Sequence, residues 1–516
     1  MTAIVETKEG RLQGVEETAS SLEGSGLTVF RGVPFAKPPV GTRRFRPPQP
    51  AEPWTGVRVC DTFGFVAPQP QGQAMAGQGT PEEQNEDCLY LNVWTPACDD
   101  AAHPVMVWIH GGAFVTGSGS GAFYRGHHLA SRGDVVVVTI NYRLGALGFL
   151  AHPDLLDEET GSSGNWGLLD QVAALQWVQA NVHLFGGDPT NVTIFGESAG
   201  SMSVSCLVGS PLAQGLFRRA IAQSGGPNGV PMTTATKAAE QLCELAGVDG
   251  VLALRDLDVA DLLAAQTKLQ LAAAESGSGM ALAPTIDGGL LPEHPLKAIE
   301  GGVAEGKELL VGTNLDEMKL WVVGNRRLTS GDEAFILRRL EKTFGPDAAD
   351  ALEAYKAARA DRGDDLSPIE LWTAIESDRV FRLPSLRMCE AQSANGTAVY
   401  DYLFTWKSPA LGGLLASCHA LEIPFVFGTL TTPGVERFTG EGPEALALSE
   451  KMQDAWLAFA KTGNPSTEGL GEWPAYDSTR RATMVLDADT RVEDAPLEAE
   501  RAYWDGRPAG RFPAED

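Results

Sequence analysis

The chain has 516 residues, 43% of them apolar, and its 67 acidic residues outnumber its 40 basic ones to give a formal net charge of −27. This length and apolar content suffice to bury a large core, whereas a strongly acidic surface repels nucleic acids and anionic membranes. Composition therefore argues against a nucleic-acid or membrane partner and favours a soluble globular protein that handles small molecules.

The N-terminal residues contain no basic segment followed by an apolar one, and no apolar run approaches the roughly 18 residues that span a bilayer. The seven cysteines, at positions 60, 88, 98, 206, 243, 389 and 418, are odd in number and form no C-x-x-C pair. Neither a zinc site nor a disulfide framework follows from this spacing. We therefore expect a cytoplasmic protein with reduced thiols, present as a monomer or homodimer.

Apolar runs alternate with helical patterns along the chain, which is typical of a mainly parallel sheet flanked by helices. Buried strands are expected at residues 105–109, 135–140, 192–195, 309–311 and 399–404. Apolar residues recur at helical spacing over residues 167–179, and again near the C-terminus over residues 452–459. These elements predict an α/β fold that occupies residues 1–516 as one domain.

Three segments interrupt this alternation. Residues 68–83 are rich in Gln, Gly and Pro and show almost no periodicity, so we expect a surface loop near the mouth of a binding site. Residues 235–280 and 331–390 are helical in pattern, and Ser-Gly-Ser-Gly at 276–279 breaks the first of these stretches. Both helical segments are predicted to be insertions over the catalytic end of the sheet, where they build the pocket.

The most informative motif is Gly-Glu-Ser-Ala-Gly at residues 196–200, directly after the predicted strand 192–195. A G-x-S-x-G pentad between a strand and a helix is the strained turn that exposes a nucleophilic serine. The glycines allow the flanking chain to approach closely, and the following helix N-terminus stabilises negative charge. Ser198 is therefore the candidate nucleophile of an α/β-hydrolase.

The partners of such a serine follow it in the order acid and then histidine. Only His294 and His419 come after Ser198. Residues 309–317 supply a strand, a glycine turn and two adjacent carboxylates, and this run lies beyond His294. The order therefore leaves His419 as the base, with an ordinary histidine pKa near ~6.5 that suits proton transfer at neutral pH.

The identity of the acid is less constrained. Glu317 is the preferred candidate and Asp316 the alternative, because adjacent residues in a turn point in different directions and only one of them faces the histidine. Asp287 and Asp401 are weaker candidates, since neither opens a loop directly after a convincing buried strand.

An oxyanion hole is predicted from the turn His-Gly-Gly-Ala-Phe at residues 110–114, which follows the strand at 105–109. In hydrolases of this type one N–H comes from the residue after the nucleophile, and the others come from a glycine-rich turn after an early strand. Gly112, Ala113 and Ala199 are the expected donors. Their absent or minimal side chains leave the backbone accessible to a substrate oxygen.

Taken together, these residues resemble the type-B carboxylesterase family, cholinesterase-like α/β-hydrolases whose N-terminal block is similar to residues 30–36. Further blocks of the family occur in order at residues 86–93, 141–143, 164–171 and 185–189. The resemblance covers most of the chain and is closest to bacterial members. It implies the triad Ser198, Glu317 and His419, and it favours Glu317 over Asp316.

The resemblance also implies a pocket. Leu320 and Trp321 are expected to line it, with Met280 and Leu282 near the acyl group of the substrate. Glu197, next to the nucleophile, is expected to hold water or to bias the pocket against anionic substrates.

Two departures from the family pattern are informative. Secreted relatives join the cysteine that corresponds to Cys88 to one after a Phe-Gly-Pro-like run, but Ala67 stands at that place and Cys60 lies seven residues earlier. The usual disulfide is therefore not expected. Cholinesterases carry a tryptophan that stacks on the quaternary ammonium, whereas residues 69–85 contain no aromatic side chain. Choline esters are accordingly predicted to be poor substrates.

The function predicted from the sequence is hydrolysis of neutral short- to medium-chain carboxylic esters through an acyl-enzyme, with no metal or organic cofactor. The same residues could act on carbamates or amides, and this alternative stays open. A lipase is disfavoured because residues 68–83 are too polar for an amphipathic lid. A non-catalytic, cholinesterase-like binding protein is the alternative from another class, and the intact triad argues against it.

Overall fold

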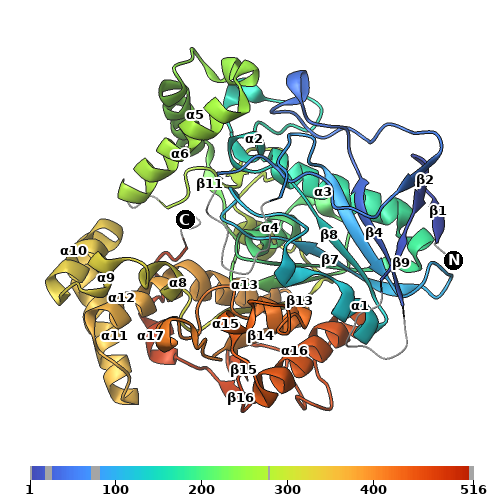
Figure 1. The fold of residues 1–516 in the computed structure, drawn as a ribbon. Helices are drawn as coiled ribbons and strands as arrows, with labels where there is room; N and C mark the ends of the chain where they lie inside the picture. Colours follow the sequence, from blue (N-terminus) through green and yellow to red (C-terminus); the bar gives the residue numbers. More distant parts are fainter. Residues whose placement is uncertain (1–2, 18–25, 71–81, 277–278, 511–516) are drawn as a thin grey trace.

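The computed structural model describes residues 3–17, 26–70, 82–276 and 279–510. A large sheet forms the centre of this part of the chain (Figure 1). Its eleven strands lie in the order β16 (Arg491–Asp494), β15 (Ala482–Leu486), β14 (Val399–Phe404), β13 (Glu308–Asn314), β10 (Arg219–Gln223), β9 (Gly187–Glu197), β7 (His103–Ile109), β8 (Val136–Ile140), β6 (Tyr90–Thr95), β4 (Leu27–Pro34) and β3 (Val15–Glu17).

The strands from β15 to β8 run parallel to their neighbours, while β16 on one side and β6, β4 and β3 on the other pair antiparallel. Because parallel strands end at the same edge of a sheet, the loops after β7, β9, β13 and β14 meet there. Each of these four loops carries part of the predicted catalytic constellation.

The five predicted strands all lie in this sheet, as β7, β8, β9, β13 and β14, and the predicted mainly parallel architecture is confirmed. The central strands are apolar on both faces, as expected for parallel strands covered by helices. In β7, Val105, Val107 and Ile109 join the apolar cluster on one face, whereas Met106 and Trp108 join the cluster on the other.

Helices cover both faces of the sheet. On the face of Val105, α3 (Trp166–Asn181), α4 (Ala199–Val208) and α13 (Leu383–Ala394) pack. On the opposite face, α1 (His127–Gly133), α14 (Ile423–Phe427) and α16 (Pro443–Thr462) pack. The predicted helices at 167–179 and 452–459 thus lie within α3 and α16, with longer extents than their periodicity alone indicated.

Two helical groups project from the same side of the molecule in Figure 1. The first is the pair α5 (Met232–Ala246) and α6 (Val259–Ser276), which corresponds to the segment at 235–280. The second comprises α8 (Lys319–Val322), α9 (Arg326–Thr329), α10 (Glu333–Phe344), α11 (Ala348–Arg362) and α12 (Pro368–Ser377). The second group has an apolar cluster of its own, which includes Leu340 and Tyr355.

A π-helical turn, Asp378–Arg382, joins α12 to α13. Because α13 packs on β13 and β14, the end of the segment at 331–390 lies against the sheet rather than above it.

The remaining elements are short. They are β1 (Ile4–Glu6), β2 (Arg11–Gln13) and β5 (Val57–Val59) in a separate small sheet, the pair β11 (Val230–Pro231) and β12 (Thr285–Ile286), and α2 (Gly145–Phe149), α7 (Pro295–Glu300), α15 (Glu436–Thr439) and α17 (Glu498–Tyr503). Most of the loop predicted at 68–83, together with residues 277 and 278 of the predicted helix break, lies outside the described residues. Within the described ranges, no helix is long and apolar enough to cross a membrane.

Candidate active site

Ser198 occupies the turn between β9 and α4 with φ of 57° and ψ of −124°, a conformation that a non-glycine residue rarely adopts. The surrounding chain holds it there, because the Ser198 N–H donates to the Gln223 carbonyl at 2.9 Å. A Cβ atom on Gly200 would lie 2.0 Å from the Ile109 carbonyl oxygen, and one on Gly196 would lie 2.6 Å from the same atom. The pentad therefore needs both glycines because the turn is pressed directly against the end of β7.

His419 lies in the loop after β14, and its Nδ1 is 2.6 Å from Glu317 Oε2. Glu317 is fully buried, and its other oxygen accepts the Asn314 N–H at 2.8 Å. Both carboxylate oxygens are thus engaged, one by the backbone and one by the imidazole. The contact sets the histidine tautomer with a proton on Nδ1, which leaves Nε2 as the nitrogen available for chemistry.

The other candidate residues lie elsewhere. Asp316 is partly exposed and its side chain accepts the Ser417 N–H at 3.2 Å, so it faces the backbone of the histidine loop rather than the ring. Asp287 accepts the N–H groups of two residues in its own turn. His294 caps α7 by accepting the Leu296 N–H. Of the candidate acids, it is Glu317 that contacts the His419 ring, at Nδ1.

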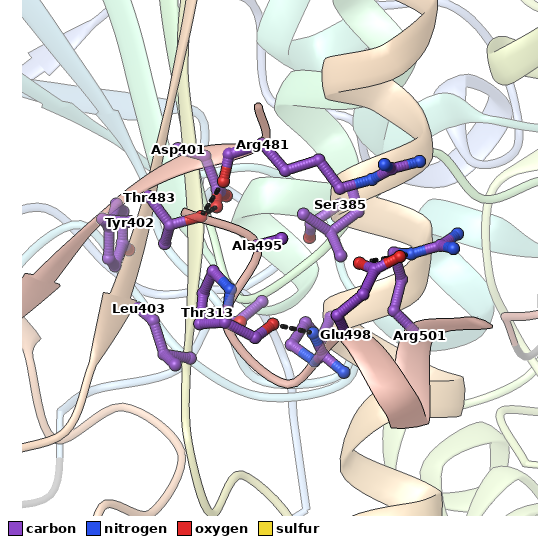
Figure 2. Close-up of a pocket in the computed structure, with 13 residues that line it drawn as sticks. Thr313, Ser385, Asp401, Tyr402, Leu403, Arg481, Thr483, Ala495, Glu498 and Arg501 are labelled. Carbon is purple, nitrogen blue, oxygen red and sulfur yellow. Dashed lines mark hydrogen bonds and ion pairs between the residues drawn. The ribbon is translucent and has the colours of Figure 1, made fainter. Parts of the chain in front are cut away.

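Asp401, the remaining candidate acid, lies beside a separate small cavity of about 20 Å³, which holds little more than one water molecule (Figure 2). Its carboxylate accepts a hydrogen bond from the Thr483 hydroxyl at 2.7 Å, and burial raises its pKa to about 7. The neighbouring cations Arg382 and Arg501 are already paired with carboxylates. At this size the cavity has no room for a substrate.

Two further buried carboxylates surround His419. Its Nε2 lies 3.0 Å from Glu197 Oε1, and within the described chain it makes no hydrogen bond to Ser198. Burial by itself disfavours the imidazolium, but the charges of Glu197 and Glu317 outweigh it and raise the pKa of His419 to about 10. Burial in turn raises the pKa of Glu197.

Glu422 is the second of these carboxylates and follows His419 by three residues. Burial, together with the charges of Glu197 and Glu317, raises its pKa to about 8. It accepts hydrogen bonds from Gln223 at 3.1 Å and Asn314 at 2.7 Å. Glu422 was not predicted from the sequence, although a single acid in the otherwise apolar stretch 420–427 is a local signal.

Aromatic rings enclose the imidazole. The ring centroids of Trp321 and Phe381 lie 4.9 Å and 4.8 Å from that of His419, and the two rings are parallel to within 5°. Phe381 comes from the π-helical turn and was not predicted, because no local motif marks its place in a long helical segment. These rings remove water from around the base and fix its orientation.

The glycine-rich turn after β7 carries the predicted oxyanion donors. Gly112 has φ of 108°, and a Cβ atom there would lie 2.1 Å from the Thr116 carbonyl oxygen. Ala113 also has a positive φ, of 54°, which is a strained value for alanine. The N–H groups of Gly112, Ala113 and Ala199 donate to no group in the described chain. Such free donors beside a nucleophile are suited to bind a developing oxyanion.

A cavity of about 210 Å³ opens over these groups and is lined by Ser198, Ala113 and Ala199. Among the predicted pocket residues, Met280, Leu282 and Trp321 also line it, and 45% of Trp321 is exposed.

Two residues predicted to belong to the pocket, Leu320 and Glu197, are not among the residues that line this cavity. Leu320 packs against the apolar cluster on the α16 face of the sheet, because consecutive residues of α8 point about 100° apart and Trp321 takes the direction of the cavity. Glu197 is buried behind the nucleophile against His419 and does not line the cavity. In the described residues, no group of His, Cys, Asp and Glu side chains is arranged to hold a metal ion.

Residues 1–504 match the carboxylesterase family. The para-nitrobenzyl esterase of Bacillus subtilis (strain 168) is 40% identical over 506 residues, which cover 96% of this chain and 97% of that protein. The phenmedipham hydrolase of Pseudarthrobacter oxydans is 35% identical, with 91% and 94% of the two chains covered. A crystal structure of the Geobacillus stearothermophilus carboxylesterase EST55 superposes with a TM-score of 0.85 at 41% identity, and covers 97% of this chain and 99% of that one.

Proposed function

The chain belongs to the carboxylesterase family, and we propose that its hydrolysis of carboxylic esters is carried out by Ser198, His419 and Glu317. The observation that carries this proposal is the 2.6 Å contact between His419 Nδ1 and the buried Glu317, on the same edge of the sheet as the strained Ser198. In the proposed reaction, His419 Nε2 accepts the Ser198 proton as the serine oxygen attacks the ester carbonyl.

The negative charge that develops on the carbonyl oxygen is bound by the N–H groups of Gly112, Ala113 and Ala199. Collapse of the tetrahedral intermediate breaks the bond to the alcohol, which leaves with the proton from His419. Water then attacks the acyl-enzyme, His419 takes a proton from it, and Ser198 is regenerated with release of the acid. No step requires a metal or an organic cofactor.

Glu197 has a defined part in this proposal. Its Oε1 lies 3.0 Å from His419 Nε2, and its negative charge, together with that of Glu317, raises the pKa of His419. The imidazolium that forms when His419 takes the Ser198 proton is stabilised by these two charges.

The substrates proposed are neutral esters with short or medium acyl chains, acted on by a monomer or homodimer. The walls of the catalytic cavity include Val115, Met202, Met280 and Leu282, and no charged side chain is among the described residues that line it. Binding then rests mainly on buried apolar area, at about 0.8 kcal/mol for each methylene group. This gain in binding free energy ends when the acyl chain becomes too long for the cavity of about 210 Å³.

The acyl-chain preference is tested with p-nitrophenyl esters from acetate to palmitate. We expect kcat/KM to rise through the medium chains and then to fall, because longer chains exceed the cavity. Aryl carbamates with the same leaving group are expected to react more slowly, since their carbonyl is less electrophilic. Carbamates that react faster than esters of equal size would contradict the ester assignment and support the carbamate or amide alternative.

Charge selectivity is tested with butyrylcholine and its neutral isostere, 3,3-dimethylbutyl butyrate. The neutral ester is expected to have the higher kcat/KM, because no carboxylate lines the described part of the cavity and the Trp321 face is stacked with Phe381. The two esters differ only in charge, so their ratio isolates that effect. A clear preference for the choline ester would show that the site binds cations.

We also propose a cytoplasmic location, for which the state of the cysteines is the supporting observation. All seven lie in the described part of the chain, and none of them is in a disulfide there. Thiol titration of the denatured, unreduced protein is expected to find seven free thiols, as is usual for proteins of a reducing compartment. A Cys60–Cys88 disulfide found by peptide mapping would contradict both the thiol count and the proposed location.

A further inference from the structure

A second cavity adjoins the catalytic one on the side of the α8–α12 group. Its volume is about 320 Å³, and Trp321 and Gly279 line both cavities. We call it the outer chamber and define it by Arg339 and Lys342 on α10, Trp372 on α12, Arg379 on the π-helical turn, and the shared Trp321. The two cavities therefore lie side by side, with Trp321 at their common border.

The π-helical turn Asp378–Arg382 forms the wall between the two cavities. Arg379 and Val380 line the outer chamber, whereas Phe381 lines the catalytic cavity and packs on His419. Such turns are rare and occur frequently at functional sites, because the additional residue redirects neighbouring side chains. Here the turn places Arg379 at the outer chamber and the ring of Phe381 against His419 at the catalytic cavity.

The outer chamber has an excess of positive charge. Arg379 is paired with Glu376 through two hydrogen bonds of 2.7 Å and 3.0 Å, so these two charges compensate. Arg339 and Lys342 also line the chamber, and neither forms an ion pair with any described residue. Two cations without a carboxylate partner among the described residues contrast with the net charge of −27 of the whole chain.

The guanidinium of Arg339 is also oriented. It lies over the ring of Trp372, 5.6 Å from the centroid. A guanidinium held over an aromatic ring can still donate two N–H groups to the two oxygens of a carboxylate. Lys342, three residues later on the same helix, supplies a second charge within reach of the same ligand.

We propose that the outer chamber is a subsite for a carboxylate at the far end of the substrate, several carbons from the ester that reacts at Ser198. This inference rests on the proposed function and deepens it by assigning a substrate class, the long monoesters of dicarboxylic acids. The two ends of such a substrate meet opposite environments. The ester lies in the uncharged catalytic cavity near the buried Glu197, and the carboxylate lies between Arg339 and Lys342.

The test uses mono-p-nitrophenyl esters of dicarboxylic acids from glutarate to sebacate. Each is compared with the neutral methyl ester of the same length, and the measured quantity is the ratio of kcat/KM for the anionic ester to that for its neutral partner. In the wild type we expect a low ratio for the short acids, whose carboxylate stays in the catalytic cavity, which no charged side chain lines among the described residues. For the long acids, whose carboxylate reaches the outer chamber, we expect a ratio on the order of tenfold higher.

Arg339→Gln/Lys342→Gln is expected to remove most of this length-dependent rise. Arg338→Gln is the matched control, because it removes the same charge from the adjacent exposed position of α10 without touching the chamber. Raising the salt from about 0.01 M to about 0.15 M shortens the Debye length from about 30 Å to about 8 Å and is expected to lower the ratio for the long acids.

The neutral methyl esters keep this inference separate from the proposed function. If the wild type fails to hydrolyse them, the proposed function is wrong. If it hydrolyses them and the ratio is flat with chain length, the anion subsite is wrong. The subsite is equally overturned if the ratio rises but Arg338→Gln lowers it as much as the double substitution does.

Discussion

Ser198→Ala is expected to abolish ester hydrolysis almost completely and to leave the fold intact. Loss of a triad nucleophile typically lowers turnover on the order of 10⁶-fold, because the residual rate comes only from binding and the oxyanion hole. The fold is expected to persist since alanine and serine meet the same backbone strain at φ of 57°. The measurements are kcat on p-nitrophenyl butyrate and the midpoint of thermal unfolding.

The control for this experiment is Ser478→Ala, which alters an exposed serine before β15. It is expected to keep both the activity and the thermal midpoint of the wild type. A folded Ser198→Ala protein that retains more than about a hundredth of the wild-type kcat would show that another group is the nucleophile.

Glu317→Gln is expected to lower kcat on the order of 10⁴-fold, whereas Asp316→Asn changes it by less than about tenfold. A neutral amide can donate to His419 Nδ1 and so favour the tautomer whose proton is on Nε2, which cannot take the Ser198 proton. The amide also carries no negative charge to stabilise the imidazolium. Asp316 instead accepts the Ser417 N–H, which an asparagine oxygen still does.

Both variants are assayed for kcat on the same activated ester, and their thermal midpoints are compared. Glu317 also accepts the Asn314 N–H, so its substitution alters a contact that stabilises the fold. An unchanged thermal midpoint would show that the lower kcat reflects lost catalysis and not lost folded protein. If Asp316→Asn is the inactive variant of the two, the assignment of the triad acid is wrong.

Much of the fold could be predicted because its central strands carry a local signal. The five predicted strands are mainly apolar runs, interrupted by few polar residues such as Thr193 and Asp401, as is typical of parallel strands buried on both faces. β10 escaped prediction because its five residues begin with Arg219 and end with Gln223, whose side chains are bound only by distant partners, among them Trp456 and the Ala460 carbonyl. The predicted α/β-hydrolase fold and the resemblance to type-B carboxylesterases are confirmed by the relatives and by the superposition with EST55.

The candidate site likewise contains residues that could be predicted from the sequence and residues that could not. The pentad selected Ser198 and order along the chain selected His419, because the topology of parallel strands places those loops at one edge of the sheet. Order could not separate Glu317 from Asp316, since that choice depends on side-chain direction in a turn. Phe381 was missed because its role arises from a contact with His419 that no local pattern encodes. Glu422, a single acid in an apolar stretch, leaves a local signal, but its partners Gln223 and Asn314 are set by the fold.

The central claim is that Ser198 is the one activated serine of this chain, and covalent labelling tests it most directly. A fluorophosphonate reacts with a serine only where a base and oxyanion donors activate it, so the folded protein is expected to gain a single adduct by intact mass. Peptide mapping is expected to place that adduct on Ser198, and the adduct is expected to be absent from Ser198→Ala. An adduct on a different serine would contradict the triad, and folded protein that gains no adduct at all would point to the non-catalytic binding protein instead.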